Sequence, residues 1–223
     1  VVGGLFGLLL AFMSIYFKAN QVIVGTAINI LAASLTTFLL VEIWGRPGQT
    51  DNVEYFKAVG PFNLFTYLAF ALVIVSYYVM YKTPFGLRVR AVGEHPRAAD
   101  TLGVNVYVIR YICVIISGVL AGIGGASLSI GSMSLFKEGM IAGKGFIALA
   151  ALIFGKWNPI GAALACLFFG FAVALETVAT NLPVPREFLY ALPYIMTMFA
   201  VSGFVGRSVG PAAGGIPYEK GEK

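Results

Sequence analysis

The sequence predicts an all-α, polytopic membrane protein: a bundle of about seven transmembrane helices with one short helix outside the membrane. Three observations support this fold class. Of the 223 residues, 59% are hydrophobic and only 11% are charged, whereas soluble domains carry about a quarter charged residues. The mean hydropathy is +0.87. The apolar residues also gather into runs close to the roughly 20 residues that an α-helix needs to cross the hydrocarbon core.

Seven apolar runs divide the chain. A backbone that crosses lipid must satisfy its own hydrogen bonds, so each run is expected to be helical. The expected spans are Gly3–Phe17, Gln21–Val41, Phe62–Tyr81, Tyr111–Gly131, Gly145–Gly155, Ile160–Thr180 and Phe188–Gly206. Residues 1–206 are therefore expected to form one transmembrane domain. Because the chain opens inside an apolar run, we expect it to be truncated at its N-terminus, with upstream sequence missing.

The run Gly145–Gly155 is too short to cross the membrane alone. Either the span extends back towards Ile141, or the run is a half-helix that is buried against protein. We take it as a crossing, which gives seven spans. If it is re-entrant instead, the orientation of everything after it is reversed.

Basic residues orient the spans, because cytoplasmic loops carry an excess of Lys and Arg. Seven spans place ten basic residues on one side: Lys18, Lys82, Arg88, Arg90, Arg97, Arg110, Lys156, Arg207, Lys220 and Lys223. The other side carries five: Arg46, Lys57, Lys137, Lys144 and Arg186. The loop 82–110 and the tail 207–223 are therefore expected in the cytoplasm. The tail is rich in Gly and Pro, and we expect it to be disordered.

The loop 82–110 contains the signals of a short helix. Pro96 suits the first helical position, because its missing N–H would be unpaired there anyway. Arg97–Leu102 then makes under two turns, and Gly103 is placed for the left-handed residue that ends a helix. So short a helix is unstable in isolation. It is expected to dock either on the underside of its own bundle or on another protein.

The second run carries polar residues that are candidates for a solute path. Thr26 and Asn29 recur near helical spacing, and Asn20 with Gln21 stands at the start of the run. A buried amide such as that of Asn29 needs a partner, which is either a neighbouring helix or water in a cavity. The sequence leaves both interpretations open.

Glycine placement favours helix packing. Gly118 and Gly122 are four residues apart, and Gly125 follows, a pattern that permits close helix crossing in lipid. The stretch Gly139–Gly145 superficially resembles a phosphate-binding loop. It lacks the required spacing and the Ser or Thr after its lysine, so ATP binding by this chain is not expected. Neither a catalytic constellation nor a metal-spaced set of ligands is present, and the basic residues form no tract for nucleic acid.

Four stretches carry a family resemblance. They are ANQVIVGTAINILAASLTTFL, GLRVRAVGEHPRAADTLGVNVYVIR, SGVLAGIGGASLS and EGMIAGKGFIALAALIFGKWNPIGA. In this order they resemble the permease subunits of bacterial ATP-binding-cassette importers of the branched-chain amino acid and simple sugar type. Within that group, the chain looks most like the nucleoside-importer permeases that work with basic-membrane-protein-type lipoproteins.

The resemblance implies a transport subunit rather than an enzyme, with a coupling helix that docks in a cleft of a partner ATPase. The residues that match the coupling segment are Gly93, Glu94, His95, Pro96, Arg97, Ala98, Ala99, Asp100, Thr101, Leu102 and Gly103. Small Ala98 and Ala99 would allow close approach, while charged neighbours pair with the cleft. No cofactor is expected on this chain, because ATP and Mg²⁺ would bind to the ATPase.

The resemblance also implies partners, a location and a solute. The expected partners are the lipid bilayer, the ATPase, a second permease and an extracytoplasmic lipoprotein, in a bacterial inner membrane. A heterodimer of permeases is favoured over a homodimer. Nucleosides are the expected solute, and simple sugars are the alternative. An ion-coupled secondary transporter would usually place a charged residue within its central spans, and those of this chain are almost free of charge.

Overall fold

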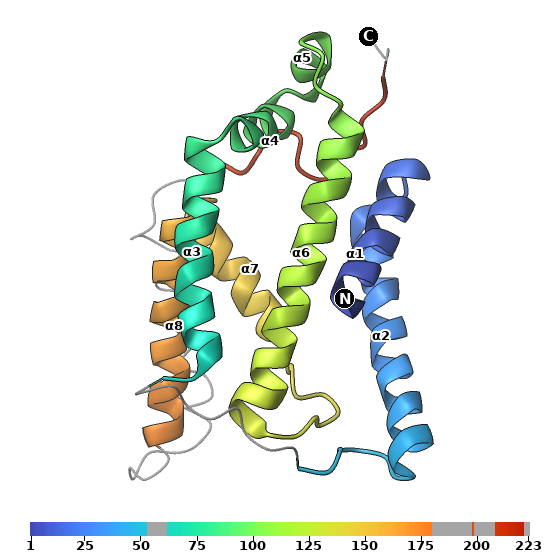
Figure 1. The fold of residues 1–223 in the computed structure, drawn as a ribbon, viewed down its shortest axis with the longest axis vertical. Coiled ribbons are helices and arrows are strands. Elements are labelled where there is room, and N and C mark those ends of the chain that lie inside the picture. The colour runs from blue at the N-terminus through green and yellow to red at the C-terminus, as the bar shows by residue number, and fades with distance from the viewer. Residues whose placement is uncertain (53–61, 180–197, 199–207, 221–223) are drawn as a thin grey trace. The chain divides into compact units, whose positions relative to one another are not determined.

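The computed structural model describes residues 1–52, 62–179, 198 and 208–220, with only the backbone given for 176–179 (Figure 1). Over these residues it consists of helices and loops without a strand, and Gln49 and Lys137 form an isolated bridge. The predicted all-α fold class is confirmed. The expected span Phe188–Gly206 lies outside the described residues but for one position.

The described chain forms two compact units. The first contains residues 1–72, 79–142 and 211–223, and the second contains residues 73–78 and 143–210. Three described helices are long and apolar enough to cross a membrane: α2 (Gln21–Trp44), α3 (Leu64–Lys82), and α6 (Val106–Leu128) with its π-helical end η2 (Ser129–Met133). Shorter apolar helices are α1 (Val2–Ala11) with its π-helical end η1 (Phe12–Tyr16), α7 (Lys144–Phe154) and the part Pro159–Leu175 of α8 (Pro159–Ala179).

These helices expose large apolar side chains that a soluble protein would bury. Ile30 and Phe38 of α2 are each more than 60% exposed, as are Ile74 of α3 and Leu164 of α8. Large apolar side chains exposed along whole helices are stable only against lipid or another protein. The exposed faces therefore agree with the transmembrane prediction.

Glycines bring α1 and α6 together in the first unit (Figure 1). A Cβ added to Gly118 would lie 2.4 Å from the carbonyl oxygen of Gly3 and 2.9 Å from the Cα of Gly7. A Cβ on Gly122 would lie 3.4 Å from the Cα of Gly3. Gly118 and Gly122 thus lie at a close backbone crossing, as small residues do in membrane helices. Gly125 faces open space and does not contribute to it.

A sharp corner joins α3 to α4 (Pro84–Glu94), a helix that the sequence analysis did not expect. Thr83 closes α3 by donating to the carbonyl of Val79, at 2.6 Å. Its hydroxyl also caps α4 by accepting from the amide of Gly86, at 3.2 Å. A Cβ on Gly86 would lie 2.2 Å from the same carbonyl oxygen. The corner therefore requires glycine there.

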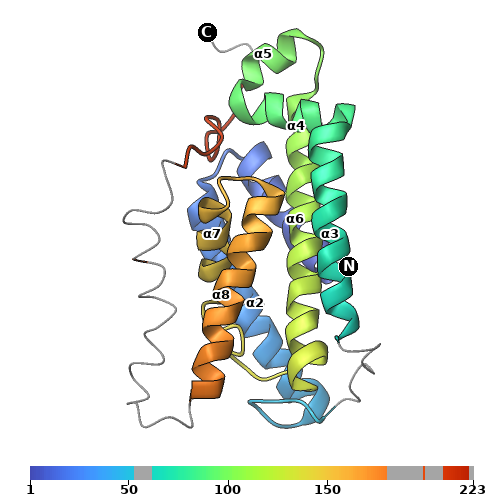
Figure 2. The ribbon, with the colours of Figure 1, turned by 90° about the vertical axis from the view of Figure 1, so that its left-hand side faces the viewer.

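The second unit contains a helical hairpin of α7 and α8 (Figure 2). Its turn places Lys156 and Trp157 at φ 54° and 58°, and the side chain of Asn158 accepts from the amide of Ile160. Helix α7 has 11 residues, which gives about 16 Å, against the roughly 30 Å of a hydrocarbon core. The helix does not extend back to Ile141, because Ala142 and Gly143 have positive φ and break it.

Candidate functional site

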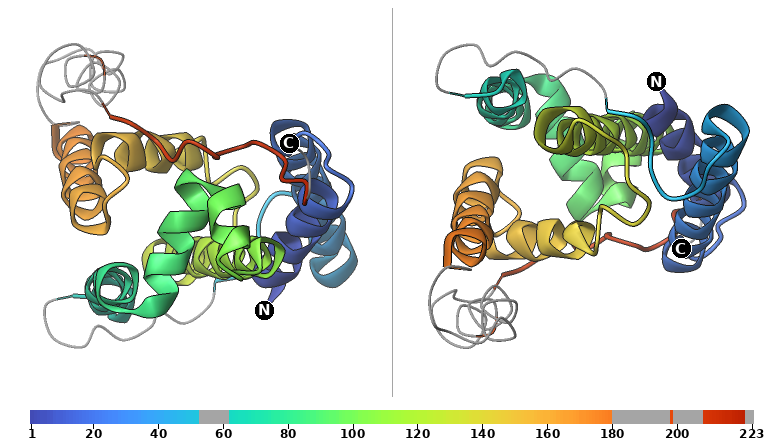
Figure 3. Two further views of the ribbon diagram at one scale, coloured as in Figure 1. Left: turned by 90° about the horizontal axis from the view of Figure 1, so that it is seen from above. Right: turned by 90° about the horizontal axis from the view of Figure 1, so that it is seen from below.

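The short helix predicted in the loop 82–110 is present as α5 (Pro96–Thr101). Pro96 occupies its first turn, and Gly103 follows its end at φ 82°. His95 links α4 to α5: its amide donates to the carbonyl of Ala91 at 2.9 Å, and its carbonyl accepts from the amide of Ala99 at 3.0 Å. Helices α4 and α5 thus meet at one irregular residue and lie at the same end of the first unit as the start of α6 (Figure 3).

One face of α5 is buried against the rest of this end. Ala99 is 3% exposed and packs with Val92 of α4 and with Val106 and Ile109 of α6. The fifth member of this cluster is Tyr218 of the C-terminal tail, which is 7% exposed. Ala99 therefore holds α5 in place and is not available for contact with a partner.

The opposite face of α5 is open. Its exposed residues are Glu94, His95, Arg97, Ala98, Thr101, Leu102 and Gly103, while Gly93, Pro96 and Asp100 are partly buried. Leu102, just after the end of α5, is 83% exposed. The structure thus separates the two alanines of the expected coupling segment: Ala98 faces outward, and Ala99 faces inward.

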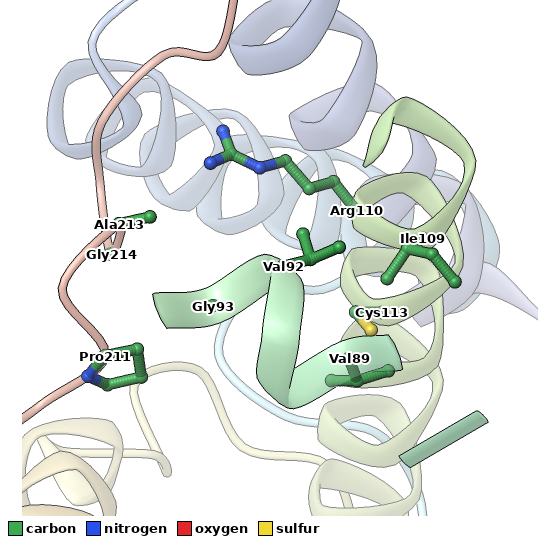
Figure 4. Close-up of a pocket in the computed structure, with 9 residues that line it drawn as sticks. All are labelled: Val89, Val92, Gly93, Ile109, Arg110, Cys113, Pro211, Ala213 and Gly214. Atoms are coloured by element: carbon green, nitrogen blue, oxygen red, sulfur yellow. The ribbon is translucent and has the colours of Figure 1, made fainter. Parts of the chain in front are cut away.

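Two depressions flank the junction of α4 and α5, and the tail forms a wall of each. The larger, of about 410 Å³, is lined by Glu94–Ala98 together with Ala212, Ala213 and Ile216. The smaller, of about 160 Å³, lies between α4, α6 and the tail (Figure 4). Its walls are mostly apolar, and the Arg110 side chain extends from α6 towards the tail.

Residues 211–220 of the tail lie along this end of the first unit. The amide of Ala213 donates to the carbonyl of Gly93 at 2.9 Å, and the guanidinium of Arg110 donates to the carbonyl of Ile216 at 2.8 Å. The rings of Tyr107 and Tyr218 pack with centroids 5.4 Å apart. The described part of the tail therefore makes specific contacts with α4 and α6.

Two ion pairs extend the tail contacts to further segments. Lys220 lies 3.7 Å from the carboxylate of Asp100 on α5. Glu219 pairs with Lys18, in the linker between η1 and α2. These tail contacts were not predicted from the sequence. One signal was available, because Tyr218 is an aromatic residue between Pro and two charged residues in a Gly-rich segment.

The candidate path residues lie on or beside α2. Asn20 caps the helix, since its side-chain oxygen accepts from the amides of Val22 at 2.9 Å and Ile23 at 3.4 Å. The hydroxyl of Thr26 bonds back to the carbonyl of Val22. Gln21, Thr26 and Asn29 are all exposed in this single chain. The structure thus gives Asn20 a capping role and leaves the other three on an open surface.

A second set of contacts closes the other end of the first unit, where the loop after α2 meets the turn after η2. The amide of Thr50 donates to the carbonyl of Phe136 at 2.9 Å, and the amide of Glu138 donates to the carbonyl of Gly48 at 2.8 Å. The hydroxyl of Thr37 on α2 bonds the carboxylate of Glu138. These bonds tie α2 to the end of α6 that is remote from α5.

Comparisons with known proteins show which proteins this chain is similar to. The chain is 45% identical to the guanosine ABC transporter permease protein NupQ of Bacillus subtilis, over 99% of this chain and 76% of that protein. It is 40% identical to the nucleoside ABC transporter permease protein NupC of Lactococcus lactis, over 99% and 75%. A putative glucose ABC transporter permease of Haloferax volcanii is 36% identical, over 77% and 56%.

No solved structure matches the chain at a comparable level. The model of the family described as "Branched-chain amino acid transport system / permease component" matches residues 1–201, which is most of the chain. The match covers every helix described above. This chain therefore belongs to the permease-component family of branched-chain amino acid transport systems.

Proposed function

We propose that this chain is a permease subunit of an ATP-driven nucleoside importer and forms part of its translocation path. The observation that carries the proposal is similarity along the whole chain to two permeases named for guanosine and for nucleosides, at 45% and 40% identity. The permease named for glucose matches a smaller part of the chain at lower identity. Nucleosides are therefore the first candidate, and simple sugars are the second.

In this proposal the open face of α5 is the docking surface for the ATPase. Helix α5 has only six residues and presents a small surface. The small side chain of Ala98, on its outer face, lets a partner surface approach closely. Glu94 and Arg97 are exposed and charged, and they are suited to pair with polar groups of a cleft. ATP and Mg²⁺ bind to the partner. This chain contributes α5, the helix that the partner moves.

The proposed orientation places α5 and the tail in the cytoplasm of a bacterial inner membrane. Ten of the 15 basic residues fall on that side when seven spans are counted. The contact between Ala213 and Gly93 supports the same count, because it puts the tail at the α5 end.

Two further partners complete the proposed transporter. A second permease, related but different in sequence, would cover the exposed apolar faces of the bundle and the open polar surface of α2 at Gln21, Thr26 and Asn29. An extracytoplasmic lipoprotein would deliver the solute at the end of the bundle remote from α5. The path would suit a neutral polar solute, since α2 carries amides and hydroxyls with its one acid, Glu42, near its end.

A competition assay tests the proposed substrate. The full-length permease, its partner permease, the ATPase and the lipoprotein are reconstituted in vesicles, and ATP-dependent uptake of a labelled nucleoside is measured against excess unlabelled nucleosides or sugars. We expect unlabelled nucleosides to compete and sugars not to. Uptake of labelled sugar that nucleosides do not inhibit would replace the substrate class and retain the permease role.

A further inference from the structure

The short helix α5 needs support from other parts of the protein to keep its position. A helix of six residues is not stable by itself, and its buried face offers one small side chain, that of Ala99. Both ends of α5 are irregular, with His95 on one side and Gly103 at φ 82° on the other. A push on its outer face would therefore turn α5 about these two joints unless something else holds it.

The tail supplies a large buried group at this point. Tyr218 is 7% exposed and belongs to the same cluster as Ala99 and Val106. Through this cluster it packs against Ala99 of α5, while its ring packs on the ring of Tyr107 of α6 at 5.4 Å between centroids. One side chain of the tail thus touches both the short helix and the long transmembrane helix.

Hydrogen bonds that involve the tail's backbone fix it before that contact and at it. The bond from Ala213 to the carbonyl of Gly93 ties it to the end of α4, and the bond from Arg110 to the carbonyl of Ile216 ties it to α6. The backbone oxygen of Tyr218 also accepts from the hydroxyl of Tyr107 at 3.3 Å. In Figure 3 the tail, in red, continues past this end towards the linker that carries Lys18, the partner of Glu219.

We propose that residues 211–220 form a strap that fastens α5 to α6, with Tyr218 as its positioning residue. The strap makes the displacement of α5 by a partner pass into α6 and the η1–α2 linker, instead of being lost in rotation about His95 and Gly103. This inference rests on the proposed coupling role of α5 and extends it. The ATPase displaces α5 through its outer face, and the strap, on the inner face of α5, transmits that displacement to α6.

The first test separates coupling from assembly. In the reconstituted transporter, Tyr218→Ala is expected to leave membrane insertion and ATPase binding intact and to lower uptake per ATP hydrolysed by about tenfold, within the usual range of coupling energies. Tyr218→Phe keeps the ring and removes only the hydroxyl, so uptake per ATP should fall by less than in Tyr218→Ala. Val209→Ala is the matched control, because Val209 lies just before the strap and is 83% exposed.

A disulfide tests the strap directly. A Cβ on Gly93 would lie 3.5 Å from the Cβ of Pro211, at the short end of the range of about 3.5–4.5 Å for disulfides. In a background with Cys113 and Cys166 replaced by Ala, the pair Gly93→Cys and Pro211→Cys is expected to form the bond on mild oxidation. Once formed, the bond should restore coupled uptake to Tyr218→Ala, and a reductant should abolish that rescue.

Three outcomes would overturn the strap: unchanged uptake per ATP in Tyr218→Ala, failure of the disulfide to form, or a disulfide that blocks transport with Tyr218 in place. The last result would mean that the tail must leave during the cycle. A wrong substrate assignment shows in the unsubstituted transporter instead. Uptake per ATP hydrolysed is then measured with the solute that this transporter carries, and the comparison between the variants tests the strap in the same way.

Discussion

Gly3 and Gly118 lie so close that a Cβ on either would approach the carbonyl oxygen of the other to 2.4 Å. Because the obstacle is backbone, no rotamer change relieves it. Gly118→Ala is therefore expected to lower the free energy of unfolding by about 1–3 kcal/mol, as overpacking does. Thermal unfolding in detergent measures the effect.

Gly125→Ala is the matched control for this crossing. It lies on the same helix, and no atom lies within 4 Å of the added Cβ. The free energy of unfolding of the Gly125→Ala protein is expected to stay within about 0.5 kcal/mol of that of the original protein or to rise slightly, because alanine is the better helix former. Equal effects of the two substitutions would contradict the α1–α6 crossing.

The two alanines of α5 are expected to respond differently to the same enlargement. Ala98 is exposed, so Ala98→Leu should leave stability within about 0.5 kcal/mol and reduce ATPase binding about tenfold or more. Ala99 is 3% exposed, so Ala99→Leu should destabilise the protein by about 1–3 kcal/mol. Unfolding in detergent and co-purification with the ATPase distinguish the two effects. Unimpaired uptake by the Ala98→Leu protein would show that α5 is not part of the docking surface.

The ion pair between Lys220 and Asp100 is expected to matter little. Their charged atoms are 3.7 Å apart, and the lysine side chain is 72% exposed, a setting in which such pairs contribute about 0–1 kcal/mol. Lys220→Ala should therefore retain uptake per ATP within about twofold. A loss as large as that of Tyr218→Ala would show that charge, rather than the buried ring, holds the tail.

The contact of Tyr218 sets a pH dependence at the alkaline end. Burial, and then the hydrogen bond to Asp100, raise its pKa above the ordinary tyrosine value of about 10. A raised pKa in the folded state means that the contact is fully present below about pH 10 and is lost as pH rises through the folded pKa. In a phenolate absorbance titration, the difference between the original and Tyr218→Phe should show one tyrosine that ionises later than the ordinary value. Ionisation at or below that value would contradict the buried position.

The sequence predicted the helices well where one residue pattern decides them. The run from Gln21 became α2, because Asn20 caps its start and Gly45, at φ 66°, ends it. Pro96 and Gly103 likewise bounded α5. In each case the deciding interaction is local, so neighbouring residues carry the information.

The remaining features depend on contacts between distant residues. Helix α4 was missed because Arg88 and Arg90 interrupt its apolar pattern, although Thr83 before Pro84 was a usable start signal. The opposite facing of Ala98 and Ala99 depends on how α5 meets α6, which six residues cannot specify. Part of the tail's attachment uses backbone atoms, such as the carbonyl of Ile216, and every residue type provides such a carbonyl.

The driving force of transport is the measurement that bears most directly on the central claim. Initial uptake of a labelled nucleoside is compared in vesicles of the complete transporter with ATP inside, with a non-hydrolysable ATP analogue, and with an imposed proton or sodium gradient alone. The account predicts uptake with ATP only, and its loss in Ala98→Leu without loss of the protein from the membrane. Uptake driven by the ion gradient in the absence of ATP would contradict it.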